Sequence, residues 1–292
     1  MAQQAEESVP QQRRVDPVIG LALGGGGARG LAHIAVLEAF DELGVRPTLI
    51  AGTSIGAIFG AGYASGLEAG AIRDHALALL SKPTRIVREL FSIRGGSLLD
   101  LWNRRPLSGS LMNPEALLEI VFPEGVARDF ADLELPLQVI ATDFHRQEAF
   151  VMQEGPLLPA VAASMALPAL FRPVAHEGRV LVDGGLANPL PFDLIEPRVD
   201  LTVAIDVTGG PVSGAEPKPP SPFEAIVASS QIMQNAIVRE KLRRHMPDVV
   251  IRPAVEPFRV LEFYKVRQIL EAAAPVKDTL KQALDARLSA AP

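Results

Sequence analysis

The sequence has 292 residues, of which 48% are apolar and 21% charged, with a formal net charge of −6 and no cysteine. That length suits one large domain or two small ones, and the lack of cysteine excludes disulfides, thiolate catalysis and Cys-ligated metal sites. An acidic balance argues against a nucleic-acid partner, for which a basic surface would be expected.

Residues 1–16 are polar and lack the apolar segment of a secretory signal. We therefore expect a disordered lead-in and a cytoplasmic protein. Residues 17–292 are predicted to form a single domain, because no linker separates two cores. Within them, residues 209–222 contain five prolines and three glycines, which predicts a surface loop.

The first half of the domain alternates between strand and helix patterns. An apolar run at residues 18–23 predicts a strand, and it stops at the four glycines 24–27. A helical pattern follows as far as Gly44, a typical helix stop. A second apolar run at 48–51 leads into Gly-Thr-Ser-Ile-Gly and another helix to about residue 65. This order predicts a three-layer α/β/α fold with a mostly parallel central sheet.

Residues 49–67 form an uncharged run of 19 residues, which is long enough to consider as a transmembrane helix. Glycine is dense in this run, and no basic residues flank it closely. A buried strand, a tight turn and a buried helix explain the same residues better, so we expect no membrane span here.

The remaining elements follow in chain order. Asn113 and Pro114 predict a capped helix at 113–121. Apolar runs predict further strands at 137–142, 149–153, 179–182, 201–207 and 249–252, and helices at 158–166, 223–246 and, around Pro275, at 263–288.

A glycine-rich loop between the first strand and the first helix is the first candidate site. Gly25, Gly27 and Gly30 match G-x-G-x-x-G, which suits a phosphate cradle, an oxyanion hole or a plain tight turn. A dinucleotide site also requires an acidic residue at the end of the second strand, and none is present. No Lys-Ser or Lys-Thr pair follows, as a P-loop would require, so the pattern favours the oxyanion hole.

Ser54 is the candidate nucleophile. It lies in Gly52-Thr53-Ser54-Ile55-Gly56, between an apolar run and a buried helix pattern. A nucleophile elbow requires that context, because its serine occupies a strained turn between strand and helix and projects its hydroxyl from the sheet.

Asp183 is the candidate base, since it follows the apolar run 179–182 and precedes two glycines. We expect its carboxylate at the edge of the sheet where parallel strands end and ligands bind. A histidine is the usual base for a serine nucleophile. Only His245 follows Asp183 in the chain, at what looks like a charged helix end, and His33 is expected to pack or bond near the glycine loop.

Taken in order, these motifs resemble the patatin-like phospholipase family. The resemblance rests on Gly25 through Gly30, on Gly52 through Gly56 and on Asp183-Gly184-Gly185. It extends to Ala141-Thr142-Asp143, to the Ala163 to Pro168 segment and to the rest of the DGGLANPLP stretch. It covers about residues 18–207, and the sequence after the proline-rich loop is less informative.

The resemblance implies a Ser–Asp dyad in which Ser54 attacks an ester carbonyl and Asp183 accepts its proton. Gly25, Gly26 and Gly27 would donate backbone N–H groups to the oxyanion, and Arg29 would shape the loop or contact a phosphate headgroup. The implied substrate is a phospholipid or lysophospholipid, with peripheral membrane contact and without a cofactor or metal.

An acyltransferase on the same dyad and a non-catalytic nucleotide- or lipid-binding regulatory protein stay open as alternatives. The sequence leaves the oligomeric state undetermined. An ordinary aspartate, with a pKa of about 3.9, is a poor base at neutral pH. Burial would therefore have to raise the pKa of Asp183.

Residues 84–102 mix arginines, among them Arg85, Arg88 and Arg94, with large apolar side chains. This composition suits either a lid that meets an anionic membrane surface or an ordinary helix that covers the core.

Overall fold

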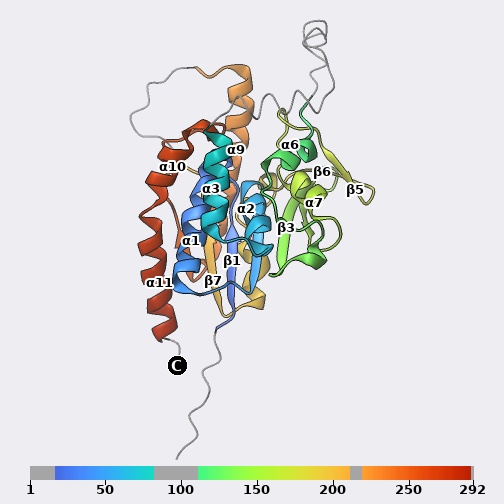
Figure 1. Cartoon of the computed structure of the whole chain (residues 1–292). Helices are drawn as coiled ribbons and strands as arrows, with labels where there is room; N and C mark the ends of the chain where they lie inside the picture. Colours follow the sequence, from blue (N-terminus) through green and yellow to red (C-terminus); the bar gives the residue numbers. More distant parts are fainter. Residues whose placement is uncertain (1–16, 82–110, 211–218, 291–292) are drawn as a thin grey trace, which may run out of the picture.

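The computed structural model of the chain describes residues 17–81, 111–210 and 219–290 (Figure 1). Its centre is an eight-stranded sheet with the order β5-β6-β3-β2-β1-β7-β8, in which β4 also pairs with β3. The strands are β1 (Ile19–Leu23), β2 (Leu49–Thr53), β3 (Leu137–Asp143), β4 (Glu148–Met152), β5 (Val174–His176), β6 (Arg179–Asp183), β7 (Leu201–Ile205) and β8 (Val249–Ile251).

The sheet is parallel on one side and antiparallel on the other. Strands β1, β2, β3, β7 and β8 run parallel to one another, as predicted. Strands β4 and β6 each pair antiparallel with β3, and β5 pairs antiparallel with β6. The buried β1, β2 and β7 are continuously apolar apart from small residues, as expected for strands covered on both faces.

Helices cover both faces of this sheet. They are η1 (Gly27–Ala32), α1 (His33–Leu43), α2 (Ile55–Ala64), α3 (Ala69–Leu80), α6 (Pro114–Val121), η2 (Phe130–Asp132), α7 (Leu157–Ser164), η3 (Gly184–Leu186), α8 (Phe192–Ile195), η4 (Glu196–Arg198), α9 (Pro222–Arg244), η5 (Phe263–Lys265), α10 (Val266–Ala273) and α11 (Val276–Ala290).

Two separate clusters of buried side chains define the layers. Leu21 and Ile50 point into the larger cluster, which includes side chains from α1, α2, α7, α10 and α11. Ala22 and Ala51 point the other way, into a cluster completed by α8 and α9. The alternation follows from the two-residue period of a strand, and it confirms the predicted α/β/α sandwich.

Local signals fix several boundaries as predicted. Gly44 ends α1 in the left-handed conformation, with φ of 64°, where glycine avoids the Cβ penalty. The side chain of Asn113 accepts the N–H of Glu115, and Pro114 is the first residue of α6. The C-terminal pattern at 263–288 is two helices, because α10 ends before Pro275 and α11 begins after it. Helices α3 and α8 and strand β5 were not predicted from the sequence.

The uncharged run at 49–67 contains β2, Ser54 and α2, as expected. Across the described ranges, the structure contains no helix of the length and apolarity that a membrane crossing requires. Three sequence predictions lie wholly or largely outside the described residues: the lead-in at 1–16, the arginine-rich segment at 84–102 and most of the loop at 209–222.

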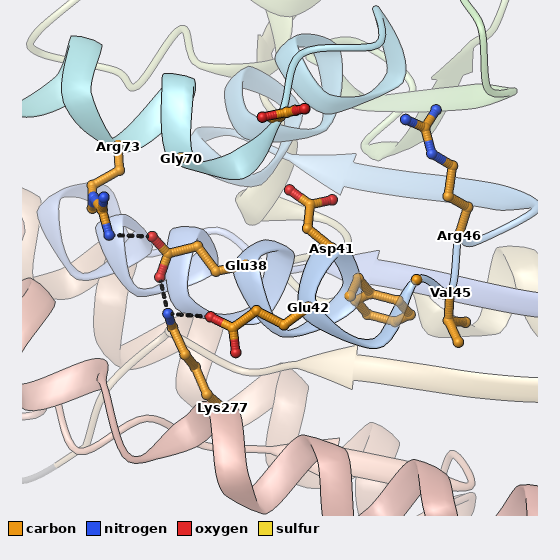
Figure 2. Close-up of a pocket in the computed structure, with 11 residues that line it drawn as sticks. Glu38, Asp41, Glu42, Val45, Arg46, Gly70, Arg73 and Lys277 are labelled. Carbon is orange, nitrogen blue, oxygen red and sulfur yellow. Dashed lines mark hydrogen bonds and ion pairs between the residues drawn. The ribbon is translucent and has the colours of Figure 1, made fainter.

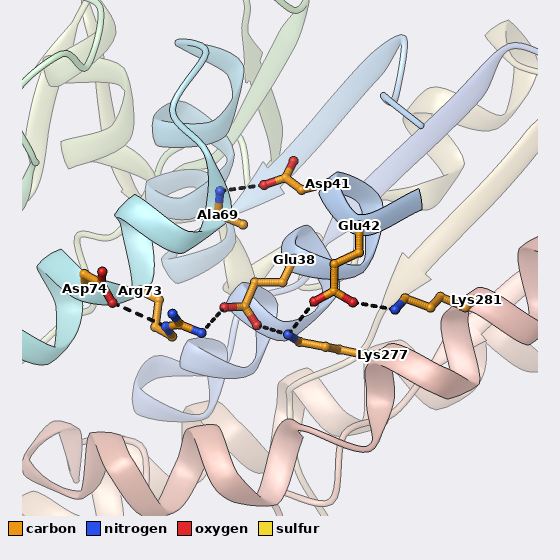
Figure 3. Close-up of polar contacts among 8 residues, drawn as sticks. All are labelled: Glu38, Asp41, Glu42, Ala69, Arg73, Asp74, Lys277 and Lys281. Carbon is orange, nitrogen blue, oxygen red and sulfur yellow. Dashed lines mark hydrogen bonds and ion pairs between the residues drawn. The ribbon is translucent and has the colours of Figure 1, made fainter. Parts of the chain in front are cut away.

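A cluster of ion pairs holds the C-terminal helix α11 against α1 (Figure 3). Nζ of Lys277 lies 2.5 Å from Glu38 and 2.9 Å from Glu42, and Lys281 also pairs with Glu42. From the other side, Arg73 of α3 lies 2.7 Å from Glu38. Because α10 contacts η1, this cluster helps to keep the C-terminal helices beside the glycine loop.

Candidate active site

Ser54 occupies the sharp turn between β2 and α2 that the elbow pattern predicts. Its φ is 55° and its ψ is −120°, a conformation that is costly for a residue with a side chain and that clusters at functional sites. The flanking glycines make the turn possible. A Cβ on Gly52 would lie 2.6 Å from the carbonyl oxygen of Gly56, and one on Gly56 would lie 2.1 Å from that of Leu23.

Asp183 lies beside Ser54, and the two side chains are hydrogen bonded. The hydroxyl of Ser54 donates to Oδ2 of Asp183 at 2.8 Å, and the backbone N–H of Gly185 donates to Oδ1 at 2.7 Å. The arrangement leaves the carboxylate with one oxygen for the serine proton and one held by the backbone.

The route by which Asp183 reaches this place differs from the prediction. Strand β6 runs antiparallel to β3, so Asp183 is not at the carboxyl end of a parallel strand. Strand β3 extends past the end of β2: Thr53 pairs with Ile140, and Asp183 pairs with the next residue, Ala141. The register on the longer β3, rather than strand direction, therefore brings the carboxylate level with Ser54.

Burial changes the acidity of Asp183. The residue is 3% exposed, and burial raises its pKa to about 6, although the hydrogen bonds from Gly185 and Ser54 lower it. A carboxylate with this pKa is a better proton acceptor near neutral pH than an exposed aspartate.

Ser164 fixes the backbone of the elbow, a role that the sequence analysis did not assign. Its fully buried hydroxyl accepts the N–H of Ser54 at 2.8 Å and donates to the carbonyl of Ile140 at 2.5 Å. Two residues on, the carbonyl of Ala166 accepts the N–H of Asp183. Residues 164–166 thus hold both Ser54 and Asp183 in place. In the sequence, the one indication of this role was the resemblance of the Ala163 to Pro168 segment to the family.

The glycine loop faces Ser54, but its three glycines are not equivalent. The N–H of Gly25 donates to the carbonyl of Pro189 at 2.9 Å, so the expectation that Gly25 also serves the oxyanion has to be corrected. No described residue accepts a hydrogen bond from the N–H of Gly26 or Gly27, and both glycines line the pocket beside Ser54.

Close contacts explain why those two positions are glycine. A Cβ on Gly26 would lie 2.2 Å from the carbonyl oxygen of Val207, and one on Gly27 would lie 2.4 Å from that of Val260. Gly27 also has a φ of 58°, in the left-handed region that favours glycine. The loop is therefore held between the end of β7 and the C-terminal segment.

His33 is hydrogen bonded to the start of the same glycine loop. Burial lowers the pKa of His33 to about 4, so its ring is neutral at neutral pH, and its Nε2–H donates to the carbonyl of Gly24 at 2.8 Å. His33 therefore makes the local hydrogen bond expected of it. The other candidate, His245, pairs with Glu196 at the end of α9 and does not line the pocket of Ser54.

Arg29 is buried behind the lining of the pocket and contacts Gln231, which is part of that lining. It is 6% exposed, its Nε donates to the carbonyl of Gly26 at 3.4 Å, and its Nη2 donates to the side chain of Gln231. A Cβ on Gly209 would collide with its guanidinium. Because Arg29 does not line the pocket, these contacts support a role in loop architecture rather than in headgroup binding.

Ser54 and Asp183 open into a small cavity of about 110 Å³ with mostly apolar walls. Its polar lining outside the pair and the glycine loop comes from Gln231 and Gln234 of α9. Apolar side chains come from widely separated parts of the chain, including Ile58, Leu117, Leu167, Phe171, Leu261 and Phe263. Such walls suit an acyl chain better than a charged ligand.

A second, larger hollow of about 560 Å³ lies between α1, α3 and α11 (Figure 2). Its charged side chains are Glu38, Asp41, Glu42, Arg46, Glu68, Arg73 and Lys277. Helix α1 begins next to the glycine loop and ends before β2 starts, so this hollow lies at the edge of the sheet opposite to Ser54. The carboxylate of Asp41 is already held by the hydroxyl of Tyr63 and the N–H of Ala69.

Comparison with known proteins shows the family to which the sequence belongs. The sequence profile described as patatin-like phospholipase matches residues 21–195. An uncharacterized NTE family protein of Mycobacterium tuberculosis is 34% identical over 209 residues, which cover 69% of this chain and 53% of that protein. Human patatin-like phospholipase domain-containing protein 6 is 36% identical over 194 residues, covering 65% of this chain and 13% of the relative.

The chain thus spans about half the length, or less, of these curated relatives. Among solved structures, VipD from Legionella pneumophila aligns with a TM-score of 0.46 at 14% identity, covering 89% of this chain and 66% of that one. Human GIVD cytosolic phospholipase A2 also gives a TM-score of 0.46, covering 94% and 59%. On the profile match and the sequence relatives, the chain belongs to the patatin-like phospholipase family.

Proposed function

We propose that the protein is a lipid acyl hydrolase that works through a Ser54–Asp183 dyad and an acyl-enzyme intermediate. The observation that carries the proposal is the hydrogen bond from a serine hydroxyl in a strained elbow to a buried carboxylate with a raised pKa. A nucleophile that is activated by an adjacent base is the arrangement that covalent catalysis requires.

In the first half of the reaction, Oγ of Ser54 attacks the ester carbonyl carbon and its proton passes to Oδ2 of Asp183. The N–H groups of Gly26 and Gly27 donate hydrogen bonds to the carbonyl oxygen and stabilise the negative charge that develops on it. Oriented donors in a site with little water are effective at this task, because they do not have to reorganise during the reaction. The carbon–oxygen bond of the leaving alcohol then breaks, and that oxygen takes the proton from Asp183.

In the second half, a water molecule attacks the acyl carbon while Asp183 accepts its proton. The bond between the acyl group and Oγ breaks, and Ser54 recovers the proton. The products are a fatty acid and an alcohol. The apolar cavity supports an acyl chain as the bound group, and we propose a phospholipid or lysophospholipid as the substrate, on the strength of the family.

We also propose that the protein contacts lipid surfaces peripherally. Leu261 lines the cavity and is 40% exposed, and Tyr264, nearby on the same segment, is 61% exposed. Amphipathic and apolar side chains at the mouth of a site favour contact with a lipid interface. Co-sedimentation with phospholipid vesicles should fall for the double variant Leu261→Ser and Tyr264→Ser, and unchanged co-sedimentation would contradict this contact.

The direct test is hydrolysis of p-nitrophenyl butyrate and of a lysophospholipid by wild type, Ser54→Ala and Asp183→Asn, with circular dichroism as the check on folding. We expect activity in the wild type and a loss of at least about a thousandfold in either variant. The exposed residues Ser229 and Asp74 provide matched controls, Ser229→Ala and Asp74→Asn, which should keep full activity. Equal activity in all folded variants would refute the dyad.

A further inference from the structure

A chain of hydrogen bonds leads from the glycine loop through α9 into the pocket. Nη2 of Arg29 donates to Oε1 of Gln231, and Nε2 of Gln231 donates to Oε1 of Gln234 at 3.2 Å. Both glutamines line the cavity of Ser54 and Asp183, and Gln234 is only 3% exposed. The chain lies partly outside residues 21–195, the part that matches the family profile.

The direction of this chain is fixed by chemistry. The guanidinium of Arg29 can only donate hydrogen bonds, so it must meet the oxygen of the Gln231 amide. The nitrogen of Gln231 then faces Gln234 and must meet the oxygen of that amide. Gln234 is left with its NH₂ group turned away from Gln231. In the described part of the chain, the hydrogen bond from Gln231 to Oε1 is the one that the Gln234 amide makes, and its Nε2 donates to no other described residue.

The free NH₂ group lies next to the carboxylate of the dyad. A Cβ built on Gly185 would lie 2.8 Å from Nε2 of Gln234 and 3.0 Å from Oδ1 of Asp183. Both polar atoms therefore border the space that a side chain at position 185 would fill, which explains why this residue is glycine. The proton that comes from Ser54 resides on Oδ2, the other oxygen of the same carboxylate, so an ester oxygen that takes it lies in the pocket that Gln234 also lines.

We propose that Nε2 of Gln234 donates a hydrogen bond to the leaving oxygen of the ester. As the carbon–oxygen bond breaks, negative charge grows on that oxygen until it takes the proton from Asp183. The amide stabilises this charge, while Gln231 and Arg29 hold the amide in the required orientation. The inference rests on the proposed hydrolase function and adds a substrate-contacting residue to it.

The basicity of the leaving group gives the inference a specific signature. A p-nitrophenolate is a stable anion and gains little from an extra donor, whereas an alkoxide gains much. The quantity to measure is kcat/KM, which reports transition-state stabilisation relative to free enzyme and ester. A purely structural role for Gln234 would change kcat/KM by the same factor for both kinds of ester.

The experiment compares ethyl butyrate with p-nitrophenyl butyrate in wild type, Gln234→Met and Gln234→Glu. Methionine keeps the length of the side chain, and glutamate keeps the acceptor for Gln231. We expect kcat/KM for the ethyl ester to fall by about thirtyfold, a modest share of what a preorganised donor contributes, and kcat/KM for the p-nitrophenyl ester to fall by less than about threefold. Gln231→Met should show the same pattern with a smaller loss.

Val238→Ala is the matched control, because Val238 is a buried residue of α9 that does not line the pocket. This variant should be less stable than wild type, but the ratio of kcat/KM for the ethyl ester to kcat/KM for the p-nitrophenyl ester should stay the same. An equal fall for both esters, or no fall, in both folded Gln234 variants would overturn the inference, while the Ser54-dependent hydrolysis of the wild type would still stand. A wild type without any esterase activity would refute the hydrolase and the inference together.

Discussion

Two hollows in the described part of the chain differ in size and chemistry, and the smaller one has the features expected of an active site. The charged groove between α1, α3 and α11 has a volume of about 560 Å³, and the cavity at Ser54 has about 110 Å³. In the groove, Glu38 and Glu42 are neutralised by Lys277, Lys281 and Arg73 (Figures 2 and 3).

At Ser54 the polar groups are fewer and less satisfied. Within the described ranges, Asp183 is buried without a cation beside it, and the N–H groups of Gly26 and Gly27 lack acceptors. Ser54 has a strained backbone. Unpaired groups held in place within apolar walls carry a cost in stability. This difference supports the proposal that the cavity is the catalytic site, whereas the ion pairs of the groove join helices.

The comparison is sharpest for glycine substitutions. Gly26→Ala places a Cβ 2.2 Å from the carbonyl oxygen of Val207, whereas a Cβ on Gly25 would meet its nearest atom at 3.5 Å and one on Gly70, in the groove, meets nothing within 4 Å. We expect Gly26→Ala to lower kcat/KM for p-nitrophenyl butyrate by more than about a hundredfold, because the loop must move.

Gly25→Ala should cost less than about tenfold, and Gly70→Ala should be neutral. Esterase assays on the three purified variants, with thermal unfolding as a check on folding, test this order. Full activity in Gly26→Ala would contradict the assignment of the oxyanion hole.

The pH dependence of activity should follow the ionisation of Asp183 and should be independent of the acidic residues of the groove. The reaction requires the ionised carboxylate, and its pKa is raised to about 6. The rate should therefore be flat above about pH 7 and fall about tenfold for each pH unit below 6. The groove acid Glu42 has a pKa held below its ordinary value by Lys281 and Lys277, so it stays ionised across this range.

A pH profile of kcat/KM between pH 5 and pH 9 measures this dependence. The Glu42→Gln variant, as control, should show the same profile. A midpoint near pH 4 would mean that burial does not tune Asp183.

Asp183 should also reduce stability, in contrast to the paired acids of the groove. A pKa raised in the folded state means that deprotonation penalises folding: the penalty is absent below the ordinary value of 3.8 and complete above about 6. At 1.36 kcal/mol per pKa unit, this corresponds to about 3 kcal/mol.

Asp183→Asn should therefore raise the free energy of unfolding at pH 8 by up to about 3 kcal/mol and leave it nearly unchanged at pH 3.5. Urea unfolding at the two pH values measures both. A variant less stable than wild type at pH 8 would show that the lost hydrogen bonds outweigh the removed charge.

The smallest effect is expected in the groove. Lys277 is 24% exposed and contacts both Glu38 and Glu42, so Lys277→Ala should cost about 1 kcal/mol of stability, and less in high salt because exposed charges are screened. Esterase activity should remain within about twofold of wild type. Urea unfolding at 0.05 and 1 M NaCl, together with an esterase assay, tests this prediction, and a large loss of activity at unchanged stability would give the groove a functional role.

Much of the fold and of the candidate site could be predicted from the sequence. Apolar runs predicted the parallel strands and their alternation with helices along the chain. The elbow pattern placed Ser54, because a tight strand-to-helix turn requires the glycines beside it. Asp183 was also predicted at the site, but from the wrong argument, which placed it at the end of a parallel strand. In the structure, the antiparallel strand β6 and its register with Ala141 bring Asp183 beside Ser54.

Other features depend on contacts between residues that are distant in the sequence, and local sequence patterns do not predict such contacts. The N–H of Gly25 is taken by Pro189, and the hydroxyl of Ser164 holds the backbone of Ser54. Neither bond has a periodicity or a motif of its own. The sequence likewise does not distinguish Gln234 from the other polar residues of the long helix α9. Its role depends on the packing of α9 against Gly185.

The central claim is that Ser54 is activated by Asp183, and covalent labelling tests it most directly. An alkyl fluorophosphonate should phosphonylate Ser54 and no other residue, as read by peptide mass spectrometry, at a rate that falls below about pH 6, the pKa of Asp183. Asp183→Asn should slow labelling by at least about a hundredfold, as the loss of a general base predicts. Labelling at another residue, or equal rates in the wild type and Asp183→Asn, would contradict the account.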